Sequence, residues 1–447
     1  MNTLIASILI VSKNNDKTIV RSINSALNQK LSETANMTFE VLVVDDVSHS
    51  KQIALLKDLE SKKIKNLHIF FSKKPLGLAK ARNYLIAKAK GTYLFFLDGD
   101  AYAHPQWIHN SVEMFKDTNV KAVASCVYFE KRKDLVNGLG GFLNKSFYGF
   151  DRYFGTYSYF LPTEPFYTLY GMGAGLILES DIVHKLHGFD QELFSWSYDD
   201  VDICLRIQLL GYAVIANPKS IIYHDTTSII NSSVARKYED IRGKLYMFII
   251  YSPMNALLQY IKAEVRVFLE ADIQYRVLYM KALLQVLSRL DLLLKRRKEV
   301  NNFAVSAIRK SLYNSFKPFL YSIGINFRNN LYGLSKQAIF SDSFRLYENT
   351  TYDINRNVFV CNANSKFRLF NDGQKTLQFE VIAPFDFSVL TICIAQSDIL
   401  KMRIRNTLEQ NKTRMFLLPL EQNINKGYVD IYVHSTQTIH ISTIKLV

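Results

Sequence analysis

The chain has 447 residues, of which 48% are hydrophobic and 21% are charged. This composition excludes a largely disordered protein, and the length predicts two or three domains. Four scattered cysteines without a CxxC pair argue against a disulfide framework or a zinc site and are typical of a reducing compartment. The formal net charge of +15 indicates that part of the surface suits an anionic partner.

The first residues read directly into a strand. Residues 4–11 are apolar and are preceded by neither a basic leader nor a small-residue cleavage site, so we expect no signal peptide. The chain also lacks a run of about 18 apolar residues, which a membrane-spanning helix would need. We therefore expect a cytoplasmic protein without a spanning helix.

Strand-like and helix-like patterns alternate four times in the first hundred residues. The strand-like runs are rich in β-branched and aromatic residues, and the segments between them space apolar residues as one face of a helix does. This alternation predicts an α/β fold, a parallel doubly wound (Rossmann-like) sheet. The predicted strands are residues 7–11, 39–44, 67–71 and 92–97.

The fourth strand ends in two carboxylates separated by a glycine, Asp98-Gly99-Asp100. Residues i and i+2 of an extended chain point to the same side, so both carboxylates can converge on one target. Ligands of open α/β sheets bind beyond the carboxyl ends of the strands. Two hard oxygen donors at that edge suit Mg²⁺ or Mn²⁺. An ordinary Asp-Gly-Asp turn is the alternative.

The second predicted strand also ends in an acidic pair, Asp45-Asp46, and Arg82 lies near the start of a later helix. Nucleotide binding would use a carboxylate for ribose hydroxyls or a base N–H, and an arginine for phosphate or base contacts. Taken singly, the acidic pair would be a helix N-cap and Arg82 a solvated helix residue.

A second acidic stretch runs from Trp196 to Arg206 and continues as an amphipathic helix that ends at Gly211. Acids at a helix start interact favourably with the helix dipole, which is the structural explanation for Asp199 and Asp202. A helix start aimed into a cleft can also hold a general base. Further on, residues 221–224 form a short strand that ends in His224; a lone histidine there is usually structural or solvated.

Four segments follow one another as in inverting glycosyltransferases of family 2, which have the GT-A fold. The segments are Ser7–Asn14, Val43–Ser48, Gly77–Asn83 and Leu97–Asp100. The resemblance covers about residues 1–230, and its motif spacing is most similar to that of galactofuranosyl- and rhamnosyltransferase-type members. The sequence departs from the family pattern at Val47, where a glycine is usual, and at Ser12-Lys13.

The resemblance implies roles for individual residues. Asp46 would contact the nucleotide base, Asp98 and Asp100 would bind the ribose and a Mn²⁺ or Mg²⁺ ion, and His224 would complete the metal site. Asp200, the second acid of the helix-start motif, would be the catalytic base. The predicted donor-binding set is Asp46, Arg82, Asp98, Asp199 and Trp196.

These roles predict a metal-dependent inverting glycosyltransferase. Its donor would be a UDP- or dTDP-linked sugar, and its acceptor a hydroxyl of a cell-envelope or capsular glycan, which could be lipid-linked. Two alternatives remain open: transfer to a protein or peptide side chain, and a catalytically dead module that binds nucleotide or glycan.

The predicted domains after residue 230 are a basic helical region, 231–332, and a β-rich region, 333–447. Between Thr226 and Asn330 there are seventeen Lys and Arg residues against seven Asp and Glu. Basic helices rich in leucine and tyrosine suit an anionic membrane face, and no nucleic-acid-binding motif accompanies them. A helical linker with a solvated face is the alternative.

The last hundred residues contain short alternating runs separated by turn signals, such as residues 377–381 and 428–433. They predict a small antiparallel β-sandwich. No constellation for catalysis occurs there. The domain could bind glycan, mediate homo-oligomerisation or brace the helices.

Overall fold

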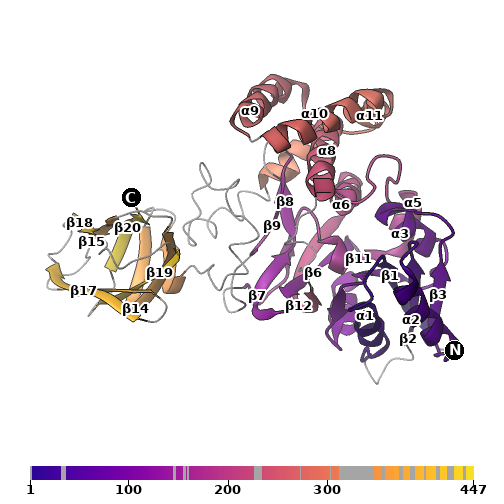
Figure 1. Cartoon of the computed structure of the whole chain (residues 1–447), viewed down its shortest axis with the longest axis horizontal. Helices are drawn as coiled ribbons and strands as arrows, with labels where there is room; N and C mark the ends of the chain where they lie inside the picture. The colour runs from indigo at the N-terminus through magenta and orange to yellow at the C-terminus, as the bar shows by residue number, and fades with distance from the viewer. Residues whose placement is uncertain are drawn as a thin grey trace. The chain divides into compact units, whose positions relative to one another are not determined.

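The computed structural model describes residues 3–31, 37–143, 147–154, 158, 161–225, 234–271, 273–302, 304–311 and the strands between 347 and 446. The chain divides into two compact units, Met1–Tyr313 and Asn314–Val447 (Figure 1).

A mixed sheet forms the centre of the first unit. Its hydrogen-bonded order is β10-β12-β6-β11-β4-β1-β2-β3, with β5 paired to β12 and β7 to β6. The pairs β1–β2, β1–β4 and β2–β3 are parallel, so the predicted Rossmann-like alternation is confirmed. The elements of this half are β1 (Thr3–Ser12), α1 (Ile19–Leu27), β2 (Met37–Asp45), α2 (Ser50–Ser61), β3 (Leu67–Phe71), α3 (Leu78–Ile86) and β4 (Tyr93–Asp98).

Both faces of this sheet are covered, which explains why its strands are apolar without interruption. Along β4, Phe95 and Leu97 belong to the core that contains α1 and α2, whereas Leu94 and Phe96 belong to the core on the other face, which contains α3. The period of two along the strand assigns neighbouring residues to opposite faces. The acids at the strand ends are therefore held by a sheet packed on two sides.

The other half of the sheet is mixed. β11 pairs antiparallel with both β4 and β6, and β12 pairs parallel with β6 and antiparallel with β5. The predicted strand 221–224 is the end of a longer strand, because β12 begins at Ala213. The remaining elements are β5 (Ala101–Ala103), α4 (Trp107–Val112), β6 (Val120–Phe129), β7 (Arg132–Leu139), β8 (Gly141–Leu143), β9 (Gly149–Asp151), β10 (Phe166–Tyr167), β11 (Leu176–Glu179), α5 (Ser180–Lys185), α6 (Asp199–Leu209) and β12 (Ala213–His224).

A helical layer continues the core of α3 and α6. Buried residues of α8 and α10, among them Phe248 and Leu278, belong to the same apolar cluster as Leu205 of α6. Figure 1 shows α8 between α6 and the outer helices. No helix in the described part of the chain has both the length and the apolar character to cross a membrane. The layer comprises α8 (Val234–Tyr251), α9 (Leu257–Glu270), α10 (Ile273–Ser288) and α11 (Leu290–Lys298).

The predicted helical region thus contains four long helices up to residue 298, and part of it, residues 312–332, lies outside the described residues.

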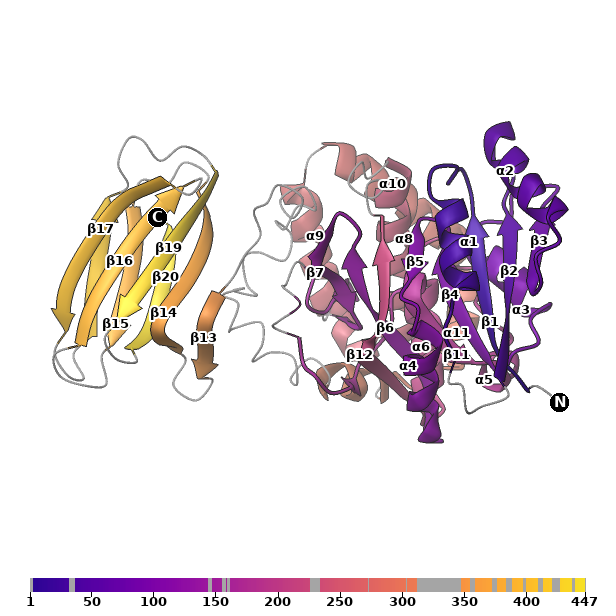
Figure 2. The same cartoon turned by 90° about the horizontal axis from the view of Figure 1, so that it is seen from below.

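The second unit is built from strands whose pairings are all antiparallel in the described part (Figure 2). One hydrogen-bonded order, β17-β16-β19-β14-β20-β15-β18, joins seven of them, and β13 pairs with β14. A sandwich of two packed sheets, and oligomerisation through this unit, stay predictions. The strands are β13 (Tyr347–Asp353), β14 (Val358–Asn371), β15 (Thr376–Ile382), β16 (Ser388–Gln396), β17 (Ile399–Leu408), β18 (Thr413–Pro419), β19 (Gly427–Ser435) and β20 (Ile439–Leu446).

Candidate active site

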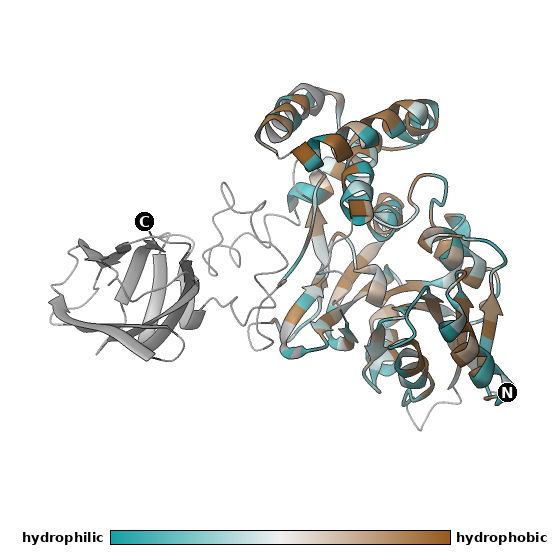
Figure 3. Ribbon diagram, in the orientation of Figure 1, coloured by the Kyte–Doolittle hydropathy of each residue, from teal (hydrophilic) through white to brown (hydrophobic). Residues whose placement is uncertain are grey.

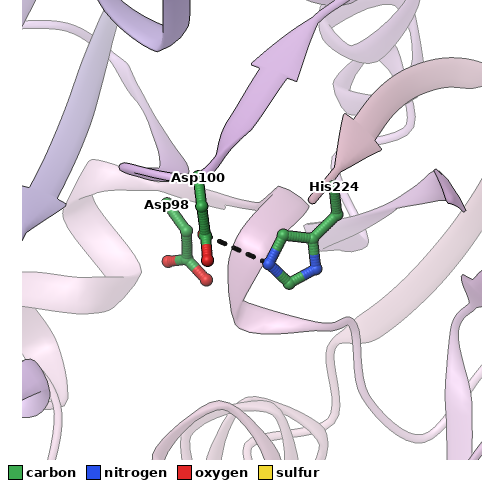
Figure 4. A group of neighbouring side chains, drawn as sticks. All are labelled: Asp98, Asp100 and His224. Atoms are coloured by element: carbon green, nitrogen blue, oxygen red, sulfur yellow. Dashed lines mark hydrogen bonds and ion pairs between the residues drawn. The ribbon is translucent and has the colours of Figure 1, made fainter. Parts of the chain in front are cut away.

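Asp98, Asp100 and His224 meet at the carboxyl end of β4. One ligand atom from each lies within 4.8 Å of the other two, and His224 Nε2 is 3.2 Å from Asp100 Oδ1 (Figure 4). His224 is far from the acids in sequence, but β5 pairs with β12 in a register that sets His224 opposite Ala101, the residue after Asp100. Strand pairing therefore assembles the predicted metal triad.

The chemistry of the triad fits a divalent cation. Two carboxylates and an imidazole are a donor set that Mn²⁺ accepts. Burial raises the pKa of Asp98, and the charge of Asp100 adds to this effect, while Arg82 and His224 oppose it. Burial alone would lower the pKa of His224, but the carboxylate of Asp100 raises it above its usual value. His224 Nδ1 is buried without a hydrogen-bond partner in the described structure. A cation among these groups would relieve the repulsion between the acids.

Gly99 keeps the turn between the two acids tight. A Cβ atom at this position would lie 2.8 Å from Ser12 Oγ and from Asn15 Oδ1. The Gly99 amide donates to the Val11 carbonyl oxygen at 3.2 Å. The close approach of Gly99 is therefore to the end of β1 and the residues just after it.

Arg82 connects the metal triad to the start of α6. Its Nη1 is 2.7 Å from Asp199 Oδ2, and its Nη2 is 3.4 Å from Asp98 Oδ1. The side chain is only 3% exposed. The sequence suggested a phosphate or base contact for Arg82, whereas the structure places its guanidinium in ion pairs with two site acids. An arginine fork suits such a role because it can hold two carboxylates at once.

Asp200 differs from its neighbours Asp199 and Asp202 at the start of α6, because its carboxylate is bound by backbone amides and not by an arginine. Its Oδ2 accepts a hydrogen bond from the Gly173 amide and its Oδ1 accepts one from the Val201 amide, both at 2.8 Å. Burial raises the pKa of Asp200 to about 7, and the neighbouring charge of Asp199 adds to the rise, against the opposing effects of Arg82 and the two amides. A carboxyl group with this pKa changes its charge near neutral pH, as a general base should.

Helix α8 holds the segment that precedes α6. Ser195 Oγ donates to Glu239 at 2.9 Å, and Ser197 Oγ donates to Asp240 at 2.7 Å. Tyr198, which has a left-handed backbone (φ 68°), packs its ring where a Cβ atom at Gly243 would lie only 2.6 Å away. The position of Asp200 therefore depends on α8.

Asp202 and its partners fasten the same helix. Arg206 Nε donates to Asp202 at 2.8 Å and Tyr251 Oη donates to it at 2.5 Å. Asp202 is thus structural, in agreement with the helix-start explanation, whereas Asp199 is occupied by Arg82.

Asp46 faces the loop before α3. Its carboxylate accepts hydrogen bonds from the amides of Leu76 at 2.6 Å and Gly77 at 3.2 Å, and Lys13 Nζ lies 3.7 Å away. The neighbouring Asp45 is bound to Ser48 and Gln52. Asp46 therefore holds the loop before α3 in place, and the base contact that the resemblance implies for it stays a prediction.

Two further residues complete the comparison with the sequence. Trp196 is 47% exposed in the turn before α6, between the two serines that are bound to α8. The sequence did not identify Gly173 as a partner of Asp200, although it lies in a run of small residues, 171–175. A Cβ atom at Gly173 would lie 2.5 Å from Arg82 Nη2, so only glycine fits there without displacing the arginine.

The mixed, mostly parallel central sheet is that of a Rossmann-like GT-A domain. Residues 7–180 match the family described as Glycosyl transferase family 2. The match extends over less than half of the chain and marks a family 2 glycosyltransferase domain within the first unit. The galactofuranosyl- or rhamnosyltransferase subtype stays a prediction.

Curated relatives match a part of the chain. Glycosyltransferase AglE of Haloferax volcanii is 31% identical over 123 residues, which are 28% of this chain and 39% of the relative. The UDP-Glc:alpha-D-GlcNAc-diphosphoundecaprenol beta-1,3-glucosyltransferase WfgD of Escherichia coli is 32% identical over 128 residues, 29% of this chain and 46% of the relative. The chain thus spans less than half the length of these relatives.

Solved structures resemble the chain at low sequence identity. The mannosyltransferase PcManGT from Pyrobaculum calidifontis, in complex with GDP-Man and Mn²⁺, is 16% identical with a TM-score of 0.42, over 72% of this chain and 84% of that one. Residues 1–349 of S. aureus TarS are also 16% identical, with a TM-score of 0.42, over 70% of this chain and 92% of that one.

Proposed function

We propose that the chain transfers a glycosyl group, with inversion, from a nucleoside-diphosphate sugar to a hydroxyl group of a cell-envelope or capsular glycan. The observation that carries the proposal is the convergence of Asp98, Asp100 and His224 beside a helix start whose Asp200 is linked to them through Arg82 and Asp199. The match of residues 7–180 to glycosyl transferase family 2 supports the reaction class.

In this proposal Asp98, Asp100 and His224 hold a divalent cation, Mn²⁺ or Mg²⁺. When bound, the cation would neutralise charge on the diphosphate leaving group. Asp46, Arg82, Asp98, Asp199 and Trp196 form the proposed donor-binding set. Within it, Arg82 and Asp46 act by holding Asp98, Asp199 and the loop 76–77 in place.

Asp200 is the proposed base. Its carboxylate takes the proton of the acceptor hydroxyl while the hydroxyl oxygen bonds to the anomeric carbon and the bond from that carbon to the diphosphate oxygen breaks. The amides of Gly173 and Val201 fix the orientation of the carboxylate. Because both amides also stabilise its charged form, they keep the pKa from rising further than burial and Asp199 already raise it.

The donor and acceptor are proposed from chemistry and relatives together. We infer a UDP- or dTDP-linked donor. The relative WfgD is a glucosyltransferase from UDP-Glc to alpha-D-GlcNAc-diphosphoundecaprenol, which supports a uridine nucleotide and a lipid-linked glycan. A lipid-linked acceptor would require peripheral membrane contact, which we assign to the region 231–332.

The proposal is tested by calorimetric binding of UDP, dTDP and GDP to the full chain, each with and without Mn²⁺. We expect one nucleotide to bind, with an affinity that Mn²⁺ raises and EDTA lowers again. If a folded sample binds none of the three in either condition, the proposal is wrong and the alternative of a catalytically dead module is favoured.

A further inference from the structure

The helical layer of the first unit leaves an apolar stripe exposed on α10. The stripe consists of Ile273, Val277, Met280, Leu284 and Leu287, and Ile273, Leu284 and Leu287 are 72%, 62% and 58% exposed. Their spacing of three or four residues keeps all five on one side of the helix.

The opposite side of α10 is apolar as well, and it packs against α8. Leu278, Tyr279, Ala282 and Val286 are buried in the core shared with α8. A helix that is apolar all round is normally buried on all sides. α10 therefore has a complete packing face and, in the described structure, a second apolar face that is exposed.

The neighbouring helices extend this exposed surface. Ile261, Val265 and Leu269 form a stripe along α9, and Leu290 and Leu294 begin one on α11. α9 contacts α8 through a different side, where Lys244 Nζ of α8 is 2.7 Å from Glu264 Oε2 and the rings of Phe248 and Tyr260 stack. Figure 3 shows brown, hydrophobic segments along these outer helices. We call this surface the outer apolar face.

The charges around the outer apolar face are predominantly positive. On α9–α11, the junction between α10 and α11 and the residue after α11, the described and exposed charged side chains are five cations and two anions. Lys298 follows Leu290 and Leu294 at the same helical spacing, and Lys281 lies directly beside Met280. The cations are Lys262, Lys281, Arg289, Lys295 and Lys298; the anions are Asp291 and Glu299.

An apolar stripe bordered by lysines matches the interface of an anionic lipid bilayer. The aliphatic side chains enter the boundary between headgroups and acyl chains, and the lysines contact the lipid phosphates. We propose that the outer apolar face docks the protein on an anionic membrane surface. A protein partner or a second copy would use the apolar stripe but would have no general need for a basic border.

The docking surface and the catalytic helix share one support. α8 binds α9 through Lys244 and the segment before α6 through Glu239 and Asp240. Docking therefore fixes the orientation of Asp200 with respect to the bilayer, which suits an acceptor whose lipid end remains in the membrane. This purpose rests on the proposed function, whereas the docking itself does not.

The test is co-sedimentation of the full chain with vesicles of phosphatidylcholine alone or of phosphatidylcholine and phosphatidylglycerol in equal amounts, at low and high salt. We expect binding to the anionic vesicles that weakens with salt. The Leu284→Gln/Leu287→Gln variant should bind about tenfold more weakly, because two leucines lose their transfer from water. Leu210→Gln, at an exposed leucine at the end of α6, is the control and should bind as the wild type does.

The charge contribution is tested separately. Lys281→Gln/Lys298→Gln should weaken binding at low salt by about tenfold, whereas Lys57→Gln/Lys73→Gln, on α2 and the loop after β3, should leave it unchanged. The proposal is overturned if the protein binds neutral and anionic vesicles equally. It is also overturned if neither Leu284→Gln/Leu287→Gln nor Lys281→Gln/Lys298→Gln weakens binding.

Two other occupants have distinct results. A dimer that Leu284→Gln/Leu287→Gln dissociates, without vesicle binding, assigns the face to a second copy and overturns membrane docking. Failure to bind vesicles without self-association also overturns it and indicates that another part of the chain covers the face. Since the assay contains neither nucleotide nor metal, these failures are separate from failure of nucleotide binding.

Discussion

Acids gather in two regions of this site, and the residues that surround them differ. At the strand ends, Asp98 and Asp100 face a histidine and an arginine, and Asp46 is held by two backbone amides. At the start of α6, Asp199 and Asp202 each have an arginine, but Asp200 between them has only amides.

The difference shows how one residue type can serve two kinds of chemistry. Strand-end acids that converge on one point repel each other, and a cation relieves this repulsion. At the helix start, arginines neutralise the two outer acids, so the remaining carboxylate can exchange a proton near neutral pH. Arg82 belongs to both regions and is the element through which a change in one should reach the other.

Asp200→Asn should have the largest effect. Removing the base should lower turnover by about a thousandfold, while metal-dependent nucleotide binding stays close to that of the wild type because the strand-end acids are unchanged. Nucleoside diphosphate release measures the first and calorimetry the second. Asp202→Asn is the control on the same helix: it should lower the melting temperature, since Tyr251 and Arg206 lose a charged partner, with much less effect on turnover. Normal turnover of Asp200→Asn would refute the assignment.

The pH profile of the wild type checks the same assignment. Burial and Asp199 raise the pKa of Asp200 to about 7, and the base acts only when it is deprotonated. The value of kcat/KM should therefore fall as the pH decreases through about 7, and this acid limb should disappear from the residual activity of Asp200→Asn. A limb that persists in the variant assigns the ionisation to another group.

Asp100→Ala addresses the strand-end region alone. Loss of a ligand should weaken the Mn²⁺-dependent part of nucleotide binding by about a hundredfold or more, since even outer partners of metal ligands contribute up to about that factor. Binding without metal should remain. Asp58→Ala, at an exposed acid on α2, is the control. An unchanged response to Mn²⁺ would place the cation elsewhere.

Arg82→Lys tests the coupling between the two regions. A lysine keeps the charge but cannot hold Asp98 and Asp199 together, so one buried carboxylate loses its direct partner. We expect a loss of about 2 kcal/mol in unfolding free energy. We also expect weaker Mn²⁺-dependent nucleotide binding and a lower turnover. Arg21→Lys, at a partly exposed pair with Glu130, is the control and should have a smaller effect. A defect confined to one assay would show that Arg82 does not couple the regions.

The sequence predicted the strand-end region well because its signals are local. Asp98 and Asp100 are two residues apart and follow an apolar run. These two facts are sufficient to place both carboxylates on the same side at a sheet edge. His224 required the resemblance, because its position depends on pairing between β5 and β12 across 124 residues. Most of β12 was missed because Pro218 and a register shift between Asn217 and Ile221 interrupt its pattern.

The role of Arg82 could not be predicted from the sequence for a related reason. Its partner Asp199 is 117 residues away, and an arginine in a helical pattern is normally solvated. Gly173 had a local signal, since small residues in a row mark a close approach, but the group that approaches it comes from α3 and α6. Local patterns identify which residues are unusual, and tertiary pairing decides what each one contacts.

The two regions also differ at one residue each whose backbone φ is positive. Val47 follows the strand-end pair Asp45-Asp46 with φ 57°, and Tyr198 precedes Asp199 with φ 68°. Left-handed backbone is unfavourable for both, and especially for a β-branched valine. The Val47 side chain is 40% exposed, whereas Tyr198 is 8% exposed and its hydroxyl accepts a hydrogen bond from the Gly149 amide. Packing therefore compensates the strain at Tyr198 and does so much less at Val47.

Val47→Gly should consequently stabilise the fold by about 0.5–1 kcal/mol, since relief of strain exceeds the extra entropy of the unfolded chain. Tyr198→Gly has the same backbone benefit but should destabilise by about 3 kcal/mol, because it removes a buried ring. Denaturant unfolding of the two variants measures both changes. If the unfolding free energy rises in Val47→Gly and falls in Tyr198→Gly, the helix start is held by side-chain packing and the strand end by the sheet. If the unfolding free energy rises in both variants, this is contradicted, because backbone strain would then dominate at both positions.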